Sequence, residues 1–181
     1  MHLEGVDDNV VLMDTISKRY SACGARLGAF ITRNKALLDA TMKFAQARLS
    51  PPGLAQIMAE AAVDLPDNYF DGTKKEYLLR RDTIVKRLNA MKDVFCLNPG
   101  GAFYAMAKLP IDDSDKFCQW LLESFSHNDQ TVMLAPATGF YGTPGLGKNE
   151  VRLAYVLNAD AINAAMDCLE AALEQYPGRT N

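Results

Sequence analysis

Hydrophobic positions in the first part of the chain follow strand-like and then helix-like patterns. Two short apolar runs, residues 9–14 and 26–33, are typical of buried strands. Apolar side chains then recur at helical spacing over residues 35–49. A Ser-Pro-Pro-Gly break at 50–53 ends that helix and precedes another over 53–63. Two strands and one helix in the first fifty residues cannot close an α/β domain, so we expect the chain to start within a sheet.

The remaining pattern predicts one long helix followed by a mixture of strands and helices. The long helix is amphipathic and runs from about residue 67 to residue 92. Its basic side chains are interspersed with acidic ones, which indicates a solvated face rather than a nucleic-acid surface. A strand, a helix, two strands and a closing helix are predicted next: residues 102–109, 113–125, 131–137, 150–157 and 158–176. This order is compatible with a small α+β layer built on the long helix.

The composition of the 181 residues is that of a globular protein and excludes several partners. Hydrophobic residues make up 49% and charged residues 23%, and the formal net charge is −3. Nothing in this balance calls for a polyanion, so no nucleic-acid partner is expected. No apolar run approaches the roughly 20 residues that span a bilayer, and the polar start at residues 2–9 is unlike a signal peptide. We therefore expect a cytoplasmic protein without a membrane partner.

Cysteines and histidines provide little for a metal or redox site. The four cysteines are widely spaced and form no C-x-x-C pair: Cys23, Cys96, Cys118 and Cys168. His2 and His127 are the only imidazoles, so no metal site is expected. Four reduced thiols agree with a cytoplasmic location.

The stretch TISKRYSACGARLG, residues 15–28, places a lysine among hydroxyls, glycines and an arginine. Lys18 follows a predicted strand, where partial desolvation would favour a neutral, nucleophilic amine. Thr15 and Ser17 supply hydroxyls, and Arg26 supplies a forked cation suited to two-point phosphate binding. An amine that forms an imine beside a phosphate clamp is what pyridoxal 5′-phosphate requires of a protein. On chemistry alone, a plain surface lysine explains Lys18 equally well.

Two later stretches also carry candidate chemistry. Arg152 lies within an apolar strand, where it needs a partner, and that partner is either a structural carboxylate or the carboxylate of a ligand. The loop GTPGLGK at 142–148 matches G-x-x-x-x-G-K. Asn149 follows it where a nucleotide-binding loop has Ser or Thr, and a strand rather than a helix is predicted after it. We therefore do not expect a nucleotide site there.

TISKRYSACGARLG resembles the motif around the cofactor lysine of the class I/II aminotransferases, the fold-type I family that includes aspartate aminotransferase. The shared features are a hydroxyl residue three before the lysine, a small residue directly before it, and an arginine eight after it followed by an aliphatic residue and a glycine. Thr15 stands where serine is more usual. The resemblance implies that Lys18 forms the internal aldimine with pyridoxal 5′-phosphate and moves the proton at the substrate α-carbon. It also implies that Thr15, Ser17 and Arg26 bind the cofactor, with Thr15 and Arg26 on its phosphate.

Two further stretches resemble the same family. GKNEVRLAYV, residues 147–156, is similar to its C-terminal arginine strand, which implies that Arg152 binds the substrate α-carboxylate. NPGGAFYAMAKLP, residues 98–110, is similar to a strand of its small domain. Phe140 and Tyr141 would lie near the substrate pocket.

The resemblance implies only the C-terminal part of the family's fold. The expected class is α/β: a three-layer αβα remnant of the cofactor domain over residues 1–50, connecting helices over 51–92, and an α+β small domain over 93–181. The family's pyridinium-contacting aspartate, its cofactor-stacking aromatic and its main phosphate loop precede the lysine. No residue of this chain is expected to take those roles.

The resemblance also implies an activity for the parent protein. That protein would transfer an amino group from an L-amino acid, with aspartate as one candidate, to a 2-oxo acid, and it would be a homodimer. We expect the isolated chain to be inactive. The alternatives are another fold-type I enzyme, such as a carbon–sulfur lyase or an aminocyclopropane carboxylate synthase, and a non-catalytic folding or dimerisation module.

Overall fold

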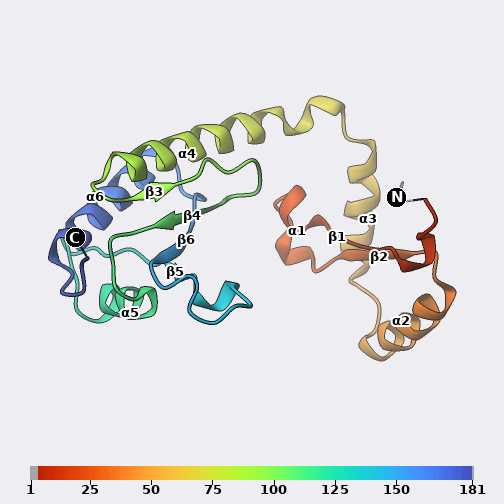
Figure 1. Cartoon of the computed structure of the whole chain (residues 1–181). Helices are drawn as coiled ribbons and strands as arrows, with labels where there is room; N and C mark the ends of the chain where they lie inside the picture. Colours follow the sequence, from red (N-terminus) through yellow and green to blue (C-terminus); the bar gives the residue numbers. More distant parts are fainter. Residues whose placement is uncertain (1–3, 181) are drawn as a thin grey trace. The chain divides into compact units, whose positions relative to one another are not determined.

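The computed structural model describes residues 4–180, so that His2 lies outside the described residues. The chain consists of two compact units, Met1–Tyr69 and Phe70–Asn181, whose elements are labelled in Figure 1. The predicted division at residues 50 and 92 stays a prediction. Across residues 4–180, no helix has the length and apolar character needed to cross a membrane.

The first unit is built on a two-stranded antiparallel hairpin. β1 (Val11–Thr15) pairs with β2 (Gly28–Thr32), and Thr15 lies opposite Gly28. The loop between them carries a single helical turn, α1 (Ile16–Arg19), and the 3-10 turn η2 (Cys23–Ala25). The other elements of the unit are α2 (Lys35–Arg48), α3 (Gly53–Ala61) and the short turns η1 (Asp7–Asn9), η3 (Ala62–Asp64) and η4 (Asp67–Phe70).

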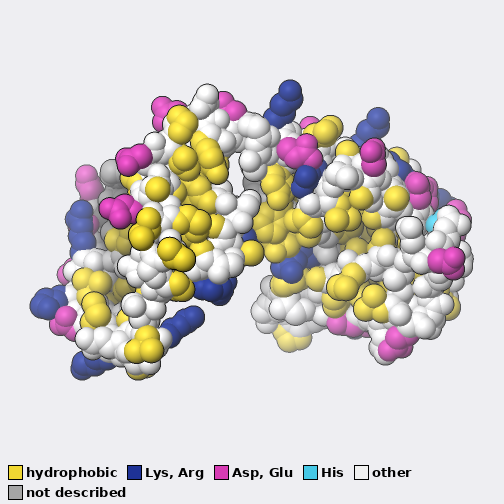
Figure 2. All heavy atoms as spheres, turned by 180° about the vertical axis from the view of Figure 1, so that it is seen from behind, with side chains coloured by type: hydrophobic (Ala, Val, Ile, Leu, Met, Phe, Trp, Pro, Cys, Tyr) yellow, Lys and Arg dark blue, Asp and Glu magenta, His cyan; other side chains and the backbone are white. Residues whose placement is uncertain are grey.

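Helix α2 begins where the sequence indicates, but the strands are not buried as predicted. The Asn34 side chain caps α2 by accepting a hydrogen bond from the Leu37 amide at 3.0 Å. In β1, however, Leu12 is 45% exposed and Met13 is 78% exposed. Among the described residues of this unit, only Thr32 and Ala55 are buried. The hairpin is not enclosed between two layers, so its side chains stay partly exposed. Figure 2 shows how much hydrophobic surface the molecule exposes.

The second unit is a four-stranded antiparallel sheet with three helices. The strand order is β3-β4-β6-β5. The strands are β3 (Phe95–Cys96), β4 (Tyr104–Lys108), β5 (Ala135–Pro136) and β6 (Glu150–Ala154). The helices are α4 (Asp71–Ala90), α5 (Ser114–Glu123), α6 (Ala159–Gln175) and the 3-10 turn η5 (Thr138–Phe140).

The core of the second unit lies on one face of this sheet. Alternation along the strands directs small and branched side chains inward: Ala105, Ala107, Val151 and Leu153. They pack with fully buried side chains of the three helices, among them Leu88, Phe117 and Leu169. The outer face carries Tyr104 and Arg152. The unit is therefore a sheet covered by helices on one side and open on the other.

The predicted helices of this unit are confirmed, and two strands differ from the prediction. Asp113 caps α5 by accepting hydrogen bonds from two amides at 3.0 and 3.1 Å. The strand predicted at 131–137 is reduced to β5, because the hydroxyl of Thr131 is bonded to the carbonyl of Leu121 in α5 at 2.6 Å, away from the ladder. The two-residue strand β3 is too short to produce a pattern in the sequence.

Candidate functional site

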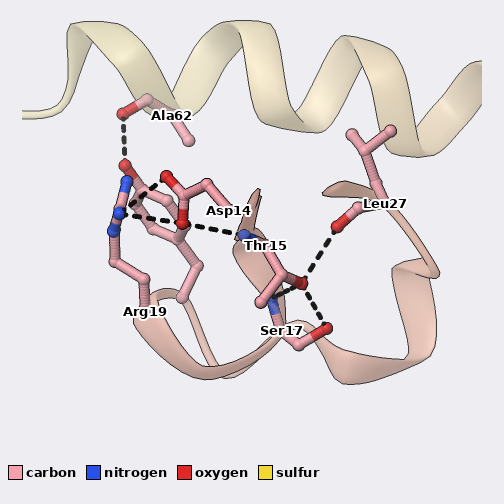
Figure 3. Close-up of polar contacts among 7 residues, drawn as sticks. Asp14, Thr15, Ser17, Arg19, Leu27 and Ala62 are labelled. Carbon is pink, nitrogen blue, oxygen red and sulfur yellow. Dashed lines mark hydrogen bonds and ion pairs between the residues drawn. The ribbon is translucent and has the colours of Figure 1, made fainter. Parts of the chain in front are cut away.

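The end of β1 is fastened to the start of β2 by the Thr15 side chain (Figure 3). Thr15 caps α1, because its Oγ1 accepts a hydrogen bond from the Ser17 amide at 3.1 Å. The same hydroxyl lies 2.8 Å from Ser17 Oγ and 3.2 Å from the Leu27 carbonyl oxygen, to either of which it can donate its proton. These bonds give Thr15 and Ser17 defined positions at the end of the hairpin.

Lys18 occupies the exposed side of α1. Its neighbour Arg19 donates two hydrogen bonds from Nη2 to the carboxylate of Asp14, at 2.8 and 3.1 Å. Asp14 also accepts a hydrogen bond from the Thr15 amide at 2.7 Å. The first unit does not provide the partial burial expected for the amine of Lys18, because α1 is a single turn on the surface of the hairpin.

Arg26 has an unusual backbone conformation, and Gly28 occupies a position where a side chain would clash with the paired strand. Arg26 has a left-handed backbone, with φ of 51°, and its Nη1 donates a hydrogen bond to the Cys23 carbonyl at 2.9 Å. A Cβ on Gly28 would lie 2.6 Å from the carbonyl oxygen of Asp14 on the paired strand. Glycine at this position therefore permits the close pairing of β1 and β2.

Three of the residues that the sequence places around a cofactor line one hollow. Thr15, Ser17 and Arg26 share a cavity of about 640 Å³ with residues from the end of α2 and the segment after it, including Arg48 and Ser50. Two guanidinium groups and three hydroxyls form a donor set that suits a phosphate. Within the described part of the chain, Lys18 is not one of the lining residues.

Arg48 was missed by the sequence analysis. It is the last residue of α2, directly before the break at 50–53, and nothing in its local pattern separates it from an ordinary C-terminal helix cation. Its place in the hollow depends on the packing of α2 beside the hairpin, which the sequence pattern did not indicate.

Arg152 lies in the second unit, between two aromatic rings. Its Cζ is 4.3 Å from the ring centre of Tyr104 on β4 and 4.6 Å from the ring centre of Phe140. Within residues 70–180, Arg152 forms no ion pair and no side-chain hydrogen bond. The two rings hold the guanidinium by cation–π contacts and leave its donors available to a carboxylate.

Glu150 and Tyr141 form a polar pair close to Arg152. The Tyr141 hydroxyl donates a short hydrogen bond to a carboxylate oxygen of Glu150, which lies two residues before Arg152 on β6. This hydrogen bond raises the pKa of the Tyr141 hydroxyl, with smaller contributions from desolvation and from the charge of Glu150. Sequence reasoning placed Tyr141 near a pocket but did not pair it with Glu150.

The loop at 142–148 is followed by strand β6 rather than by a helix, as predicted. Ser114, at the start of α5, donates from Oγ to the Gly147 carbonyl at 3.0 Å and from its amide to the Lys148 carbonyl at 2.6 Å. Gly147 has φ of 78°, and a Cβ there would lie 2.8 Å from the backbone of Ala137. The loop is thus held against α5 and η5.

Comparison with known proteins finds one family. The model of the family "aminotransferase class I and II" matches residues 2–167. Aspartate aminotransferase of Pyrococcus horikoshii is 29% identical over 92% of this chain. Among solved structures, alanine aminotransferase from Pyrococcus furiosus is 30% identical over 92% of this chain, with a TM-score of 0.78. An aromatic aminotransferase from Pyrococcus horikoshii is 26% identical over 96% of this chain, with a TM-score of 0.82.

The chain spans less than half of each of these proteins. It covers 42% of the aspartate enzyme, 42% of the alanine enzyme and 45% of the aromatic enzyme. The structural likeness extends over nearly all of this chain, so both units take part in it.

Proposed function

Because the chain belongs to the class I and II aminotransferase family, we propose that the protein is part of an aminotransferase that uses pyridoxal 5′-phosphate. The amino donor would be an L-amino acid and the acceptor a 2-oxo acid. The names of the relatives favour aspartate as the donor, since several curated relatives are aspartate aminotransferases. A homodimer, as the family resemblance implies, would be the assembly.

The observation that carries this proposal is the hollow at the end of the hairpin. Arg26 and Thr15, with Arg48 beside them, would hold the phosphate of the cofactor by charge and hydrogen bonds. Ser17, bonded to Thr15, would add a hydroxyl on the same side. Pyridoxal 5′-phosphate, when bound, supplies an aldehyde that condenses with amines and a ring that withdraws electrons from the bond being broken.

Lys18 would act at the reacting atoms. It follows Ser17 on α1, next to the residues that line the hollow. Its Nζ would supply the amine to which the cofactor is attached, and it would move the proton between the substrate α-carbon and C4′ of the cofactor. Partial removal of this amine from water is needed for that role, because only the neutral form accepts a proton.

Arg152 would orient the substrate. Its guanidinium lies between Tyr104 and Phe140 and has no carboxylate partner among residues 70–180. A two-point contact with the α-carboxylate would fix the substrate, and the flanking rings would exclude water from one side of the contact.

The test is covalent labelling of the chain with its cofactor. We would add pyridoxal 5′-phosphate to the purified protein, reduce with borohydride and map the modified lysines by mass spectrometry. A phosphopyridoxyl group is expected on Lys18, and it should be lost in Lys18→Ala. Arg26→Ala should lower the labelling at Lys18 by about tenfold, the loss expected for one charge-assisted phosphate contact.

Lys35→Ala is the matched control. Lys35 is also exposed in the first unit, where it pairs with Asp39 on α2 at 3.1 Å. This variant should label at Lys18 like the unmodified protein. Labelling spread evenly over the surface lysines would contradict the proposed cofactor role of Lys18.

A further inference from the structure

We propose that Tyr141 holds the carboxylate of Glu150 away from Arg152 and thereby keeps the Arg152 guanidinium open to the carboxylate of a substrate. This inference rests on the proposed role of Arg152. It assigns Tyr141 as a positioning residue that acts through Glu150.

The strand β6 places opposite charges within reach of one another. Glu150 and Arg152 are two residues apart, so their side chains project from the same face of the sheet, about 6.6 Å apart along the strand. Both side chains are long enough to close that distance. An ion pair is therefore the expected arrangement, yet none forms between them among residues 70–180.

Each of the two charges is held by a different neighbour. The Tyr141 hydroxyl donates to Glu150, while the rings of Phe140 and Tyr104 flank Arg152. Phe140 and Tyr141 are consecutive residues, so a single backbone segment controls both charges. The aromatic rings hold Arg152 and the Tyr141 hydroxyl holds Glu150. Together they keep apart two charged side chains that their spacing on β6 would otherwise bring into contact.

The segment that carries Phe140 and Tyr141 is itself fixed to β6. The amide of Ala137, which is fully buried, donates to the Glu150 carbonyl at 3.1 Å. The Phe140 amide donates to the Ala137 carbonyl at 2.9 Å. Tyr141 therefore meets Glu150 in a defined geometry, as a positioning contact requires.

A freed Glu150 would compete directly with a bound carboxylate. Ion pairs at this degree of exposure change an equilibrium by a small factor. Removing the Tyr141 hydroxyl should therefore weaken carboxylate binding at Arg152 by about two- to fivefold. Replacing Glu150 by glutamine should remove this competition whether or not the hydroxyl is present.

The first experiment tests the separation without any ligand. We would follow the Nε–Hε resonance of Arg152 by NMR in the full chain and in Tyr141→Phe, Glu150→Gln and the double variant. The resonance should move in Tyr141→Phe, because Glu150 then pairs with Arg152, and it should return to its original position in the double variant. Glu150→Gln alone should leave it nearly unmoved. Tyr141 is 41% exposed, so its replacement should not disturb the fold.

A second titration distinguishes this inference from the proposed function. With succinate as the probe, Tyr141→Phe should raise the Kd at Arg152 by about two- to fivefold, and the double variant should restore it. Tyr77→Phe is the matched control, since Tyr77 packs on Phe103 and Tyr155 instead. If succinate does not bind at Arg152 but the resonance moves as described, the carboxylate role fails and the separation stands.

A second partner for Glu150 defines the result that would overturn the inference. Lys108 lies directly opposite Glu150 on β4 and is a second cation that could attract a freed Glu150. If the Arg152 resonance stays in place in Tyr141→Phe, Glu150 has turned to Lys108 or to solvent, and Tyr141 does not protect Arg152. A shift in Glu150→Gln as large as that in Tyr141→Phe would equally show that the two charges already interact.

Discussion

The two compact units use their hydrophobic side chains in opposite ways. In the second unit, Leu88, Phe117 and Leu169 are completely buried against one face of the sheet. In the first unit, Met13 and Phe44 are 78% and 77% exposed. Burial of apolar surface supplies most of the free energy of folding, and a lone two-stranded hairpin is marginal in water. The second unit is therefore stabilised by its own core, whereas the first has amphipathic elements with little to cover them.

This difference distinguishes the proposed cofactor site from the proposed carboxylate site. The residues proposed to hold the cofactor belong to the unit with little core, and Arg152 belongs to the unit with a full core. We therefore expect the carboxylate site to persist in conditions under which the cofactor site has already lost its structure.

The largest effect should come from a pair of leucine truncations. Leu169→Ala should lower the free energy of unfolding of the second unit by about 2–5 kcal/mol, because it leaves a cavity in a packed core. Leu54→Ala in α3 should change the free energy of unfolding of the first unit by less than about 0.5 kcal/mol, since Leu54 is 83% exposed. Urea unfolding followed by circular dichroism measures both. Equal losses would contradict the difference in burial between Leu169 and Leu54.

A smaller loss of folding stability is expected at high pH, and it should come from the second unit. Burial raises the pKa of Tyr176 to about 12, and its hydrogen bond to Asp112, 3.0 Å long, contributes further. The ordinary value is about 10, so the unfolded chain releases this proton first as the pH rises. The stabilisation by Tyr176 is therefore complete below about pH 10 and is lost between about pH 10 and 12.

Comparison of Tyr176→Phe with the unmodified chain isolates this contribution. The variant should lose stability less steeply over that range when urea unfolding is repeated at a series of pH values. Asp112→Asn should reduce the slope only in part, because burial is the larger cause of the shift. Identical slopes in all three proteins would mean that another group controls alkaline unfolding.

The smallest effect should come from two matched helix caps. Asn34 accepts from the Leu37 amide at 3.0 Å in the first unit, and Asn158 accepts from the Ala161 amide at 2.8 Å in the second. Each replacement by alanine should cost about 1 kcal/mol. By hydrogen exchange, Asn158→Ala should speed exchange throughout the second unit, whereas Asn34→Ala should affect α2 alone. Faster exchange in α6 on loss of the Asn34 cap would show that the two units unfold together.

Local sequence signals predicted the helices well because their causes are local. The side chains of Asn34, Asp113 and Asn158 cap α2, α5 and α6 through hydrogen bonds to amides two or three residues further on. The apolar runs at 9–14 and 26–33 predicted strands correctly but burial incorrectly. A run of valines and leucines shows that a strand prefers to be covered, and it cannot show whether a covering layer is present.

Some residues of the candidate sites could be predicted from a local motif, and others could not. Lys18, Thr15, Ser17 and Arg26 stand out because they lie within one short motif. Arg48 and Tyr104 do not, since each reaches its position through packing between segments far apart in the sequence. The contact of Tyr141 with Glu150 crosses a loop whose course is set by Gly147 and Ser114. Such contacts depend on the tertiary structure, which no local pattern encodes.

The left-handed backbone of Arg26 has a consequence for how this loop can change. A non-glycine residue in that conformation costs on the order of 1 kcal/mol, so glycine would relax the turn and stabilise the hairpin. The same replacement would remove the guanidinium proposed to bind the phosphate. Replacing Arg26 by glycine should therefore raise the stability of the hairpin and weaken the proposed phosphate binding. A selection for thermal resistance alone should favour the loss of Arg26.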